Sequence, residues 1–482
     1  MSPRPARRTF RLPVVVLVVA LAAGAVYLDR TAPEASGARA RTTTAAGALQ
    51  GPTVPRTDAV STAWYCAEGT STADGRADET VVIGNLSTAN VDAAVTVMPG
   101  GGKPPVSKRV SVAGFGQGRV RIADILATPE PGVVVEVFGG PAVVEHVLSG
   151  NGDVAVGPCA RDAAPDWYFA AGTTDKDAQQ YLALFNPYGD DAIVDVTFLT
   201  DSGVQAPEAF QGYVVPRRSR VSLPVHDEVR RAGQVAAFVH ARTGRVVAER
   251  TQRFDGSLGR YGIDVSLGAT APATKWVLPF GDAQPGSAES VALANFSLLP
   301  ADVEVDVLVE GTAVATPQTL QVPGRSVTPI DVGSKAAVGT NYTVVVKSTR
   351  GQAVVAEMFF NRNGTGGVQG SGTAIGATGA ARTWAFALGR TDDGSDARLV
   401  AFNPGPKPVT VELRAYTAGD PNSPHSAPAV AIPAGDRGDF DLGAQDIHPD
   451  QLFVVASDGP IVAGRELTAG GVSIATGIPF SP

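Results

Sequence analysis

The sequence is poor in the residues that usually carry chemistry. It has 2 Cys and 5 His in 482 residues, and the histidines fall into no metal-ligand spacing. Neither His-Glu-x-x-His nor Gly-x-Ser-x-Gly occurs, so the signatures of zinc peptidases and of serine hydrolases are missing. No glycine-rich stretch leads into Lys-Ser or Lys-Thr, which argues against a phosphate-binding loop. We therefore expect no catalytic residues, no cofactor and no enzymatic activity.

Charged and aromatic residues are also scarce. Charged residues make up 18% of the chain and aromatic residues 6%, whereas about a quarter of an ordinary globular domain is charged. The net charge is −8, although residues 1–11 carry four arginines and no acid. An acidic remainder without a basic patch argues against nucleic acid and anionic lipid as partners. The 55 Gly and 36 Pro favour a β protein with many turns.

Tryptophan is rare but regularly placed. The four tryptophans are spaced 103, 109 and 108 residues apart, and an asparagine ends an apolar run 19 to 21 residues after each one. Repetition at a fixed period indicates a copied structural unit, and this unit has the size of a small domain. We therefore expect four domains arranged like beads on a string. The repeated residues are Trp64, Trp167, Trp276 and Trp384, with Asn85, Asn186, Asn295 and Asn403.

The second unit shows its strand pattern most clearly. Residues 193–199 alternate apolar and polar side chains, which predicts a strand with one face in a core. Two further apolar runs, 235–241 and 246–251, flank Thr243-Gly244, which predicts a hairpin. Six or seven short strands in about 105 residues are typical of an antiparallel, immunoglobulin-like β-sandwich. A propeller blade needs only four strands in about 45 residues, so the length of the repeat favours a sandwich over a blade.

The N-terminal end predicts a membrane anchor. Four arginines (residues 4, 7, 8 and 11) precede the uncharged run Leu12–Leu28, which is about 25 Å long as a helix and just sufficient to span a bilayer. The positive-inside rule places residues 1–11 in the cytoplasm. A signal peptide cleaved near Ala23-Gly24-Ala25 is the alternative, and it exports the remainder equally.

The predicted organisation is all-β beyond this anchor. A flexible stalk, rich in Ala, Thr, Gly and Pro, follows the apolar run, since such a stretch cannot bury a core. Four tandem sandwich repeats then complete the chain. The boundaries are 1–11 for the cytoplasmic tail, 12–28 for the transmembrane helix, 29–60 for the disordered stalk, and 61–162, 163–271, 272–380 and 381–482 for the repeats.

Several repeated motifs resemble a known family. The stretches WYCAEG from Trp64, LALFNP from Leu182, VDVTFLTDSG from Val194, and the later VVPRRSRV and RVVAER resemble a repeat in exported proteins of high-GC Gram-positive bacteria. Over residues 61–482 the chain resembles a membrane-anchored actinobacterial family of unknown function. The resemblance implies an extracytoplasmic β array without an established activity.

The Val-Val-Ala-Glu segment of this repeat varies along the chain. Glu249 and Glu357 follow Val-Val-Ala in the second and third units, whereas we match His146 and Gly464 to this position in the first and fourth. The variation leaves it open whether this glutamate has the same role in every copy.

Two cysteines bracket the first unit. Cys66 lies in its tryptophan strand and Cys159 near its end. In an exported domain this pattern predicts one structural disulfide. Free thiols and an intermolecular bridge are the alternatives, and a two-cysteine metal site lacks histidines nearby in the sequence.

Each unit also has an acidic loop between its tryptophan and asparagine strands. We expect solvated hairpin loops, with calcium as the alternative because clustered aspartates supply oxygen ligands. The best calcium candidates are Asp392, Asp393 and Asp396. The tryptophans are expected to pack in the core, although they could instead stack on sugars. The asparagines are expected to cap turns.

Repetition without a unique cluster of reactive residues favours a non-enzymatic scaffold or interaction protein of the cell envelope. We expect it to cross the membrane once through Leu12–Leu28 and to contact envelope proteins or polysaccharide. The alternative is a carbohydrate-binding array that recognises cell-wall or capsular polysaccharide. A third hypothesis, an envelope hydrolase, predicts one deep acidic cleft in a single unit.

Overall fold

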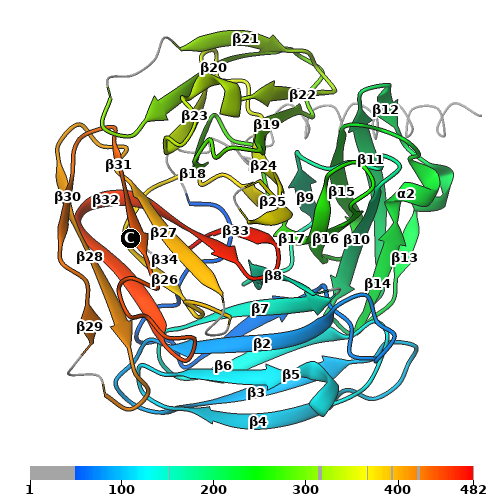
Figure 1. Cartoon of the computed structure of the whole chain (residues 1–482). Coiled ribbons are helices and arrows are strands. Elements are labelled where there is room, and N and C mark those ends of the chain that lie inside the picture. Colours follow the sequence, from blue (N-terminus) through cyan, green and yellow to red (C-terminus); the bar gives the residue numbers. More distant parts are fainter. Residues whose placement is uncertain are drawn as a thin grey trace, which may run out of the picture. The chain divides into compact units, whose positions relative to one another are not determined.

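The computed structural model describes residues 49–150, 152–312, 317–365, 367–391, 395–420 and 424–480. The expected tail (1–11), the membrane span (12–28) and the stalk up to residue 48 lie outside these residues. Within the described ranges no helix is both long and apolar enough to cross a membrane. The described chain is all-β, as the sequence predicts, and its named strands pair antiparallel in several sheets (Figure 1).

The first quarter, residues 61–162, forms two four-stranded sheets that share an apolar core. Their strand orders are β1-β6-β3-β4 and β5-β2-β7-β8. The elements are β1 (Ser61–Cys66), β2 (Asp78–Asn85), β3 (Val91–Met98), β4 (Val106–Val112), β5 (Gln117–Arg121), the 3-10 helix η1 (Ile122–Asp124), β6 (Gly132–Phe138), β7 (Ala142–Gly150) and β8 (Asp153–Pro158).

The third quarter, residues 272–380, repeats both strand orders as β18-β23-β20-β21 and β22-β19-β24-β25. Its elements are β18 (Lys275–Gly281), β19 (Ser287–Asn295), β20 (Ala301–Val309), β21 (Gln318–Val322), β22 (Ser326–Asp331), η3 (Gly333–Lys335), β23 (Tyr342–Ser348), β24 (Val355–Asn363) and β25 (Gln369–Ile375).

The second quarter, residues 163–271, has the orders β12-β11-β15-β9 and β14-β10-β16-β17, with β13 also paired to β11. The alternating run 193–199 lies in β11, where Val194, Val196 and Phe198 are fully buried. The elements are β9 (Asp166–Phe169), β10 (Ala178–Asn186), β11 (Ala192–Thr200), β12 (Gly203–Gln205), η2 (Glu208–Phe210), β13 (Tyr213–Val215), β14 (Ser219–Pro224), α2 (Val225–Glu228), β15 (Val235–Thr243), β16 (Val247–Asp255) and β17 (Tyr261–Leu267).

In the fourth quarter, residues 381–482, one long strand joins the two sheets. The first part of β32 pairs with β28 and β26, and its second part pairs with β27 and β33. The elements are β26 (Ala381–Phe386), β27 (Asp396–Phe402), β28 (Val409–Tyr416), β29 (His425–Ser426), β30 (Val430–Ile432), β31 (Arg437–Asp441), β32 (Leu452–Thr468), β33 (Val472–Thr476) and β34 (Ile478–Pro479).

The strands around Thr243-Gly244 do not form the predicted hairpin. β15 pairs with β11 and β9, whereas β16 pairs with β10 and β17 in the other sheet. In the third quarter, β23 and β24 likewise belong to different sheets. A turn dipeptide shows only that the chain bends, while the partner of each strand is set by the sheet face that it buries. β16 also pairs with the following strand β17.

The quarters are packed together and are not independent beads. Residues 46–482 form one compact unit, and apolar side chains of the first and fourth quarters share one core cluster. Four strands, one from each quarter, are neighbours: β8 contacts β17, β17 contacts β25, β25 contacts β33, and β33 contacts β8 (Figure 1). The contacts between quarters therefore run in a closed cycle.

The segment from residue 49 onwards belongs to this fold. Val54 is 1% exposed, its N–H donates to the carbonyl of Pro479 at 2.8 Å, and it forms a parallel bridge with Phe480. The backbone N–H of Gln50 donates to Thr378 Oγ1 at 3.1 Å. The expected flexible stalk therefore ends before residue 60, because Gln50 and Val54 within it contact the third and fourth quarters.

Candidate functional site

The four tryptophans lie in the core. Trp64, Trp167, Trp276 and Trp384 are 0%, 2%, 0% and 1% exposed. In the last three, the indole N–H donates to the backbone carbonyl of Val246, Val354 and Ile461, at 2.7, 2.8 and 2.9 Å respectively. A buried indole needs such an acceptor, so these three side chains tie the tryptophan strand to the segment where the chain crosses between the sheets. The indole nitrogen of Trp64 has no hydrogen-bond partner among the described residues.

The four asparagines close the turn after the second strand of each quarter. Asn186 illustrates the pattern: its amide donates to the carbonyls of Asp190 at 2.8 Å and Val215 at 3.1 Å, and its oxygen accepts from the N–H of Tyr188. Asn85, Asn295 and Asn403 make the equivalent contacts. One side chain thus supplies hydrogen bonds to the backbone of the turn and ties the turn to the opposite sheet.

A glutamate that contacts the preceding quarter recurs in three quarters. In the ladder this residue lies opposite the residue three before the asparagine, and the equivalent residues are Glu145, Glu249, Glu357 and Gly464. The expectation that His146 holds this position is wrong by one residue. The first quarter reads Val143-Val144-Glu145, so its valine pair is shifted relative to Val-Val-Ala-Glu. We call the contact between two neighbouring quarters a seam.

The seam between the second and third quarters is held by Arg250 and Glu357, both buried. The guanidinium donates to both carboxylate oxygens, at 2.6 and 3.1 Å. Glu357 also accepts the N–H groups of Ala170 and Ala171, at 3.0 and 2.8 Å, and the hydroxyl of Ser266 at 3.0 Å. Arg250 donates back to the carbonyl of Ala171. Both carboxylate oxygens and both terminal guanidinium nitrogens are thus hydrogen-bonded, which favours a buried pair, and only Arg250 Nε has no partner among the described residues.

The seam between the fourth and first quarters copies this arrangement. Arg465 donates to Glu145 at 2.9 and 3.2 Å and also to the carbonyl of Leu388, whose N–H donates to Glu145 at 3.0 Å. Arg465 lies over the ring of Phe386 at 5.5 Å, as Arg250 lies over Phe169 at 5.7 Å. Two alternate seams of the cycle therefore use the same charged latch.

The seam between the third and fourth quarters lacks the latch. Gly464 takes the glutamate position, and the ring of Phe280 lies where a side chain would be, only 2.3 Å from an ideal Cβ. Pro279 precedes Phe280 and has no N–H for a carboxylate to accept. Met358 replaces the arginine. Instead, Arg437 of the fourth quarter donates to the carbonyl of Gly281 at 2.7 Å.

A polar cleft opens at this same seam. Arg362 and Arg398 each donate to both Asp282 and Glu466, so the four side chains form a ring of alternating charge. Burial acts to raise the pKa of Glu466, but Arg398 and Arg362 outweigh it and lower that pKa. The cleft encloses about 810 Å³, open solvent at its mouth included. It is lined by Asp282, Gln284, Pro285, Arg362, Thr365, Val368, Asp396, Ala397, Arg398, Asp441, Glu466 and Thr468.

The seam between the first and second quarters has a histidine in place of the arginine. His146 Nδ1 lies 3.3 Å from Glu79 Oε1, and its Nε2 lies 3.6 Å from Glu249 Oε2. Glu249 accepts the N–H groups of Ala67 and Glu68 at 3.2 and 2.6 Å, as Glu357 does at the next seam. Glu249 therefore keeps the contact with the two backbone N–H groups, whereas His146 takes the place of the arginine.

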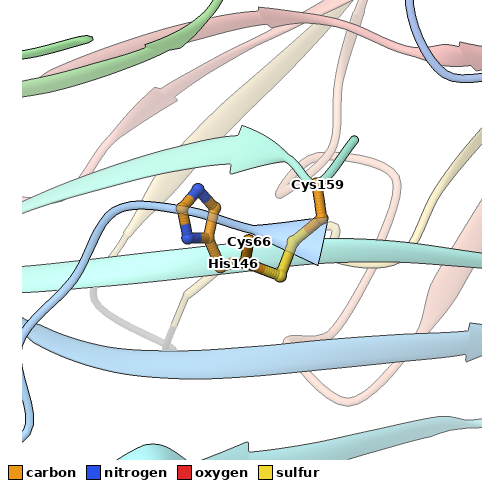
Figure 2. Close-up of side chains that lie close together, drawn as sticks. All are labelled: Cys66, His146 and Cys159. Atoms are coloured by element: carbon orange, nitrogen blue, oxygen red, sulfur yellow. A yellow bond between two sulfur atoms is a disulfide. The ribbon is translucent and has the colours of Figure 1, made fainter. Parts of the chain in front are cut away.

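Cys66 and Cys159 form the expected disulfide, which is confirmed. Figure 2 shows the imidazole of His146 beside it, and a ring nitrogen and both sulfurs lie within 4.8 Å of one another. The expectation that no histidine lies near the cysteines is therefore wrong, because β7 and β8 bring His146 next to Cys159. With the two sulfurs bonded to each other, neither is a thiolate for a metal.

The acidic loops are less solvated than expected. Asp177 pairs with Arg260 and is 3% exposed, while Asp282 and Glu289 are 2% and 3% exposed. Burial raises the pKa of Glu289 to about 8. Of the calcium candidates, Asp392 and Asp393 lie outside the described residues, and Asp396 lines the polar cleft. The sequence reading missed this cleft, since among its charged residues only Asp282 and Asp396 belong to acidic loops.

Fold and seams together define a disulfide-bonded, all-β protein with sandwich-like sheets. The chain belongs to a family of unknown function (DUF5719), which it matches over residues 150–395 and 269–477. It matches no curated protein.

Two solved structures show a faint likeness. An α-L-rhamnosidase from Streptomyces avermitilis, complexed with L-rhamnose, is 10% identical at a TM-score of 0.13, covering 64% of this chain. This chain spans 46% of the rhamnosidase. A tetra-tandem repeat from the extending region of a large adhesion protein is 13% identical at a TM-score of 0.10, covering 82% of this chain and 93% of that one. At these scores the likeness carries no argument about fold or function.

Proposed function

We propose that this chain is a non-enzymatic scaffold or interaction protein of the bacterial cell envelope, anchored by Leu12–Leu28 and exposed outside the cytoplasm. The closed cycle of seams carries the proposal, because each quarter is fixed to both neighbours by buried contacts. Such a body suits the presentation of a fixed surface to a partner. The Cys66–Cys159 disulfide supports export, since disulfides persist in oxidising compartments. The arginines before residue 12 support a cytoplasmic N-terminus.

Four immunoglobulin-like sandwich repeats are part of this proposal. The same strand orders recur in all four quarters, with additional edge strands in the second and fourth. The Arg–Glu latch, however, recurs only at alternate seams. Arg220 and Arg437 likewise donate to the equivalent carbonyls of Gly69 and Gly281 at the other two seams. These alternations favour two copies of a two-quarter unit over four identical steps.

The polar cleft between the third and fourth quarters is the best candidate for the partner-binding surface. It lies at the seam where the chain departs from its own pattern, and Asp396 and Asp441 at the cleft have no ion pair among the described residues. A photo-crosslinking amino acid at Gln284, which lines the cleft, should give adducts of discrete mass in intact cells. The same amino acid at exposed Asp190 is the control. Equal adduct patterns from both positions, or none from Gln284, would contradict a partner site at the cleft.

Recognition of envelope polysaccharide is the second candidate function. The carboxylates, guanidinium groups and hydroxyls of the cleft suit hydrogen bonds to sugar hydroxyls. The full-length protein should then be retarded in native gels that contain purified wall or capsular glycan. Asp396→Asn with Asp441→Asn should abolish the retardation, whereas the charge-matched pair Asp190→Asn and Asp420→Asn should retain it. Unretarded wild-type protein argues against glycan binding and leaves the scaffold role as the proposal.

A further inference from the structure

The seam between the first and second quarters differs chemically from every other seam in the described chain. At the latch positions, two seams have an Arg–Glu pair, and a third has Met358 and Gly464. Only here does a histidine, His146, lie between two carboxylates from different quarters, Glu79 of β2 and Glu249 of β16. The guanidinium group keeps its charge at all ordinary pH values. Imidazole changes its charge near neutral pH.

The three side chains are buried and incompletely hydrogen-bonded. His146, Glu79 and Glu249 are each 0% exposed. Glu79 Oε2, Glu249 Oε1 and His146 Nε2 have no hydrogen-bond partner among the described residues. Buried polar atoms without partners are costly and rare in native proteins. Additional protons on this cluster supply the missing donors, so its state of protonation decides how stable the seam is.

The other charges around the cluster do not replace the histidine. Glu68 is occupied by Arg220 at 2.6 Å and by Arg76 at 3.6 Å. Glu145 and Arg250 on the same strands, β7 and β16, bind across other seams. Asp78 pairs with Arg121. The disulfide beside His146 does not titrate. The charged groups outside the cluster that act on Glu79 are Arg220, Glu68 and Asp78.

We infer that the seam between the first and second quarters is a proton-dependent latch, closed when the His146–Glu79–Glu249 cluster is protonated and weakened as the pH rises. In the closed state one imidazolium lies between the two glutamates, and the glutamate pair carries one negative charge. Removal of protons leaves two buried carboxylates facing each other without a cation. The repulsion loosens Glu249 from the amides of Ala67 and Glu68.

Burial of the two glutamates also favours the protonated, closed seam. It raises the pKa of Glu249 to about 7 and that of Glu79 well above its ordinary value. Arg220 near Glu79 and His146 near Glu249 act against this rise without cancelling it. The closed seam therefore binds more protons than the open one, and its stability falls as pH rises from the ordinary glutamate range through 7 and beyond.

Hydrogen exchange of the full-length protein tests the inference, because each seam has its own reporter amides. Between pH 5.5 and 8.5, after correction for intrinsic exchange, protection of Ala67 and Glu68 should fall at least about tenfold. Leu388, whose N–H donates to Glu145 opposite Arg465, should change by less than about twofold, since the guanidinium group keeps its charge throughout this window. Parallel pH profiles for Ala67 and Leu388 would overturn the inference.

A double variant provides the second arm. Glu79→Gln with His146→Arg copies Gln180 and Arg250, the residues at the equivalent positions of the second quarter. It should remove the pH dependence at Ala67 and Glu68 while Ala170 and Ala171 keep their wild-type protection. A variant that retains the wild-type pH profile contradicts the inference. If the variant does not fold, the comparison of the two wild-type seams still decides.

Discussion

The Arg250–Glu357 latch gives the sharpest test of how the quarters are held together. The substitution Glu357→Ala removes a side chain with 0% exposure. It leaves the guanidinium of Arg250 buried without its main counter-ion and takes the acceptor from the amides of Ala170 and Ala171. Breaking one partner of such a pair costs about 3–5 kcal/mol, because the remaining charge stays buried and unpaired.

The size of the thermal shift follows from the size of the unit. If roughly 430 residues unfold together, the unfolding entropy is about 0.9 kcal/mol per kelvin, so ~4 kcal/mol lowers Tm by about 4–5 °C. Differential scanning calorimetry measures this directly. The control is Glu304→Ala. The Glu304 carboxylate lies 3.3 Å from Lys347 Nζ, and the Glu304 side chain is 30% exposed. An exposed ion pair is worth about 0–1 kcal/mol.

A double-mutant cycle separates the charge from the packing. Arg250→Met in the Glu357→Ala background removes the stranded guanidinium and places methionine where the third quarter has Met358. The double variant should therefore be less destabilised than the sum of the single variants. The reasoning fails if Glu357→Ala costs no more than Glu304→Ala, or if the two substitutions are simply additive.

Three further outcomes follow from the structure. Replacing Cys66 and Cys159 by serine opens a loop with a sequence separation of 93 and should cost about 2–5 kcal/mol in denaturant unfolding; an unchanged midpoint would be inconsistent with this. Gly464→Ala places a Cβ 2.3 Å from the ring of Phe280 and should cost about 1–3 kcal/mol. Gly189→Ala, with nothing within 4 Å, should be nearly neutral, and equal Tm values for the two would refute the packing argument. Asn295→Ala deprives the carbonyls of Leu299 and Val322 of a donor and should lower the free energy of unfolding by about 1–3 kcal/mol, whereas a loss below 0.5 kcal/mol would contradict the role of the asparagine as a clamp.

Local pattern was sufficient for the strands and the disulfide. The alternation in residues 193–199 predicts β11, and the two cysteines at the ends of the first quarter predict their own bond. Both inferences depend on near neighbours or on a residue type with a single strong preference. The partner of a strand is a different matter. Thr243-Gly244 turns the chain in either a hairpin or a crossing between sheets, and only burial across the whole quarter decides between the two.

The seams could not be predicted from one sequence because they join residues about 100 positions apart or more. Glu357 contacts Arg250, and Glu145 contacts Arg465, across 107 and 320 positions. The register shift at Val143-Val144 also concealed Glu145 as the counterpart of Glu249. The reason for a glycine at position 464 is visible only in the structure, where Phe280 and Pro279 lie on the other side of the seam. A polar cleft formed by several distant segments leaves no periodic signal along the chain.

The bridge between Val54 and Phe480 has a consequence for how the chain can be cut. Two bridged backbones lie about 5 Å apart, so a short linker could join residue 480 to residue 54. New ends could then be opened at the exposed turn of Arg350 and Gly351, where a break crosses no seam. Such a circular permutant would fold to the same body. The order of the quarters along the gene is then separable from their order in space.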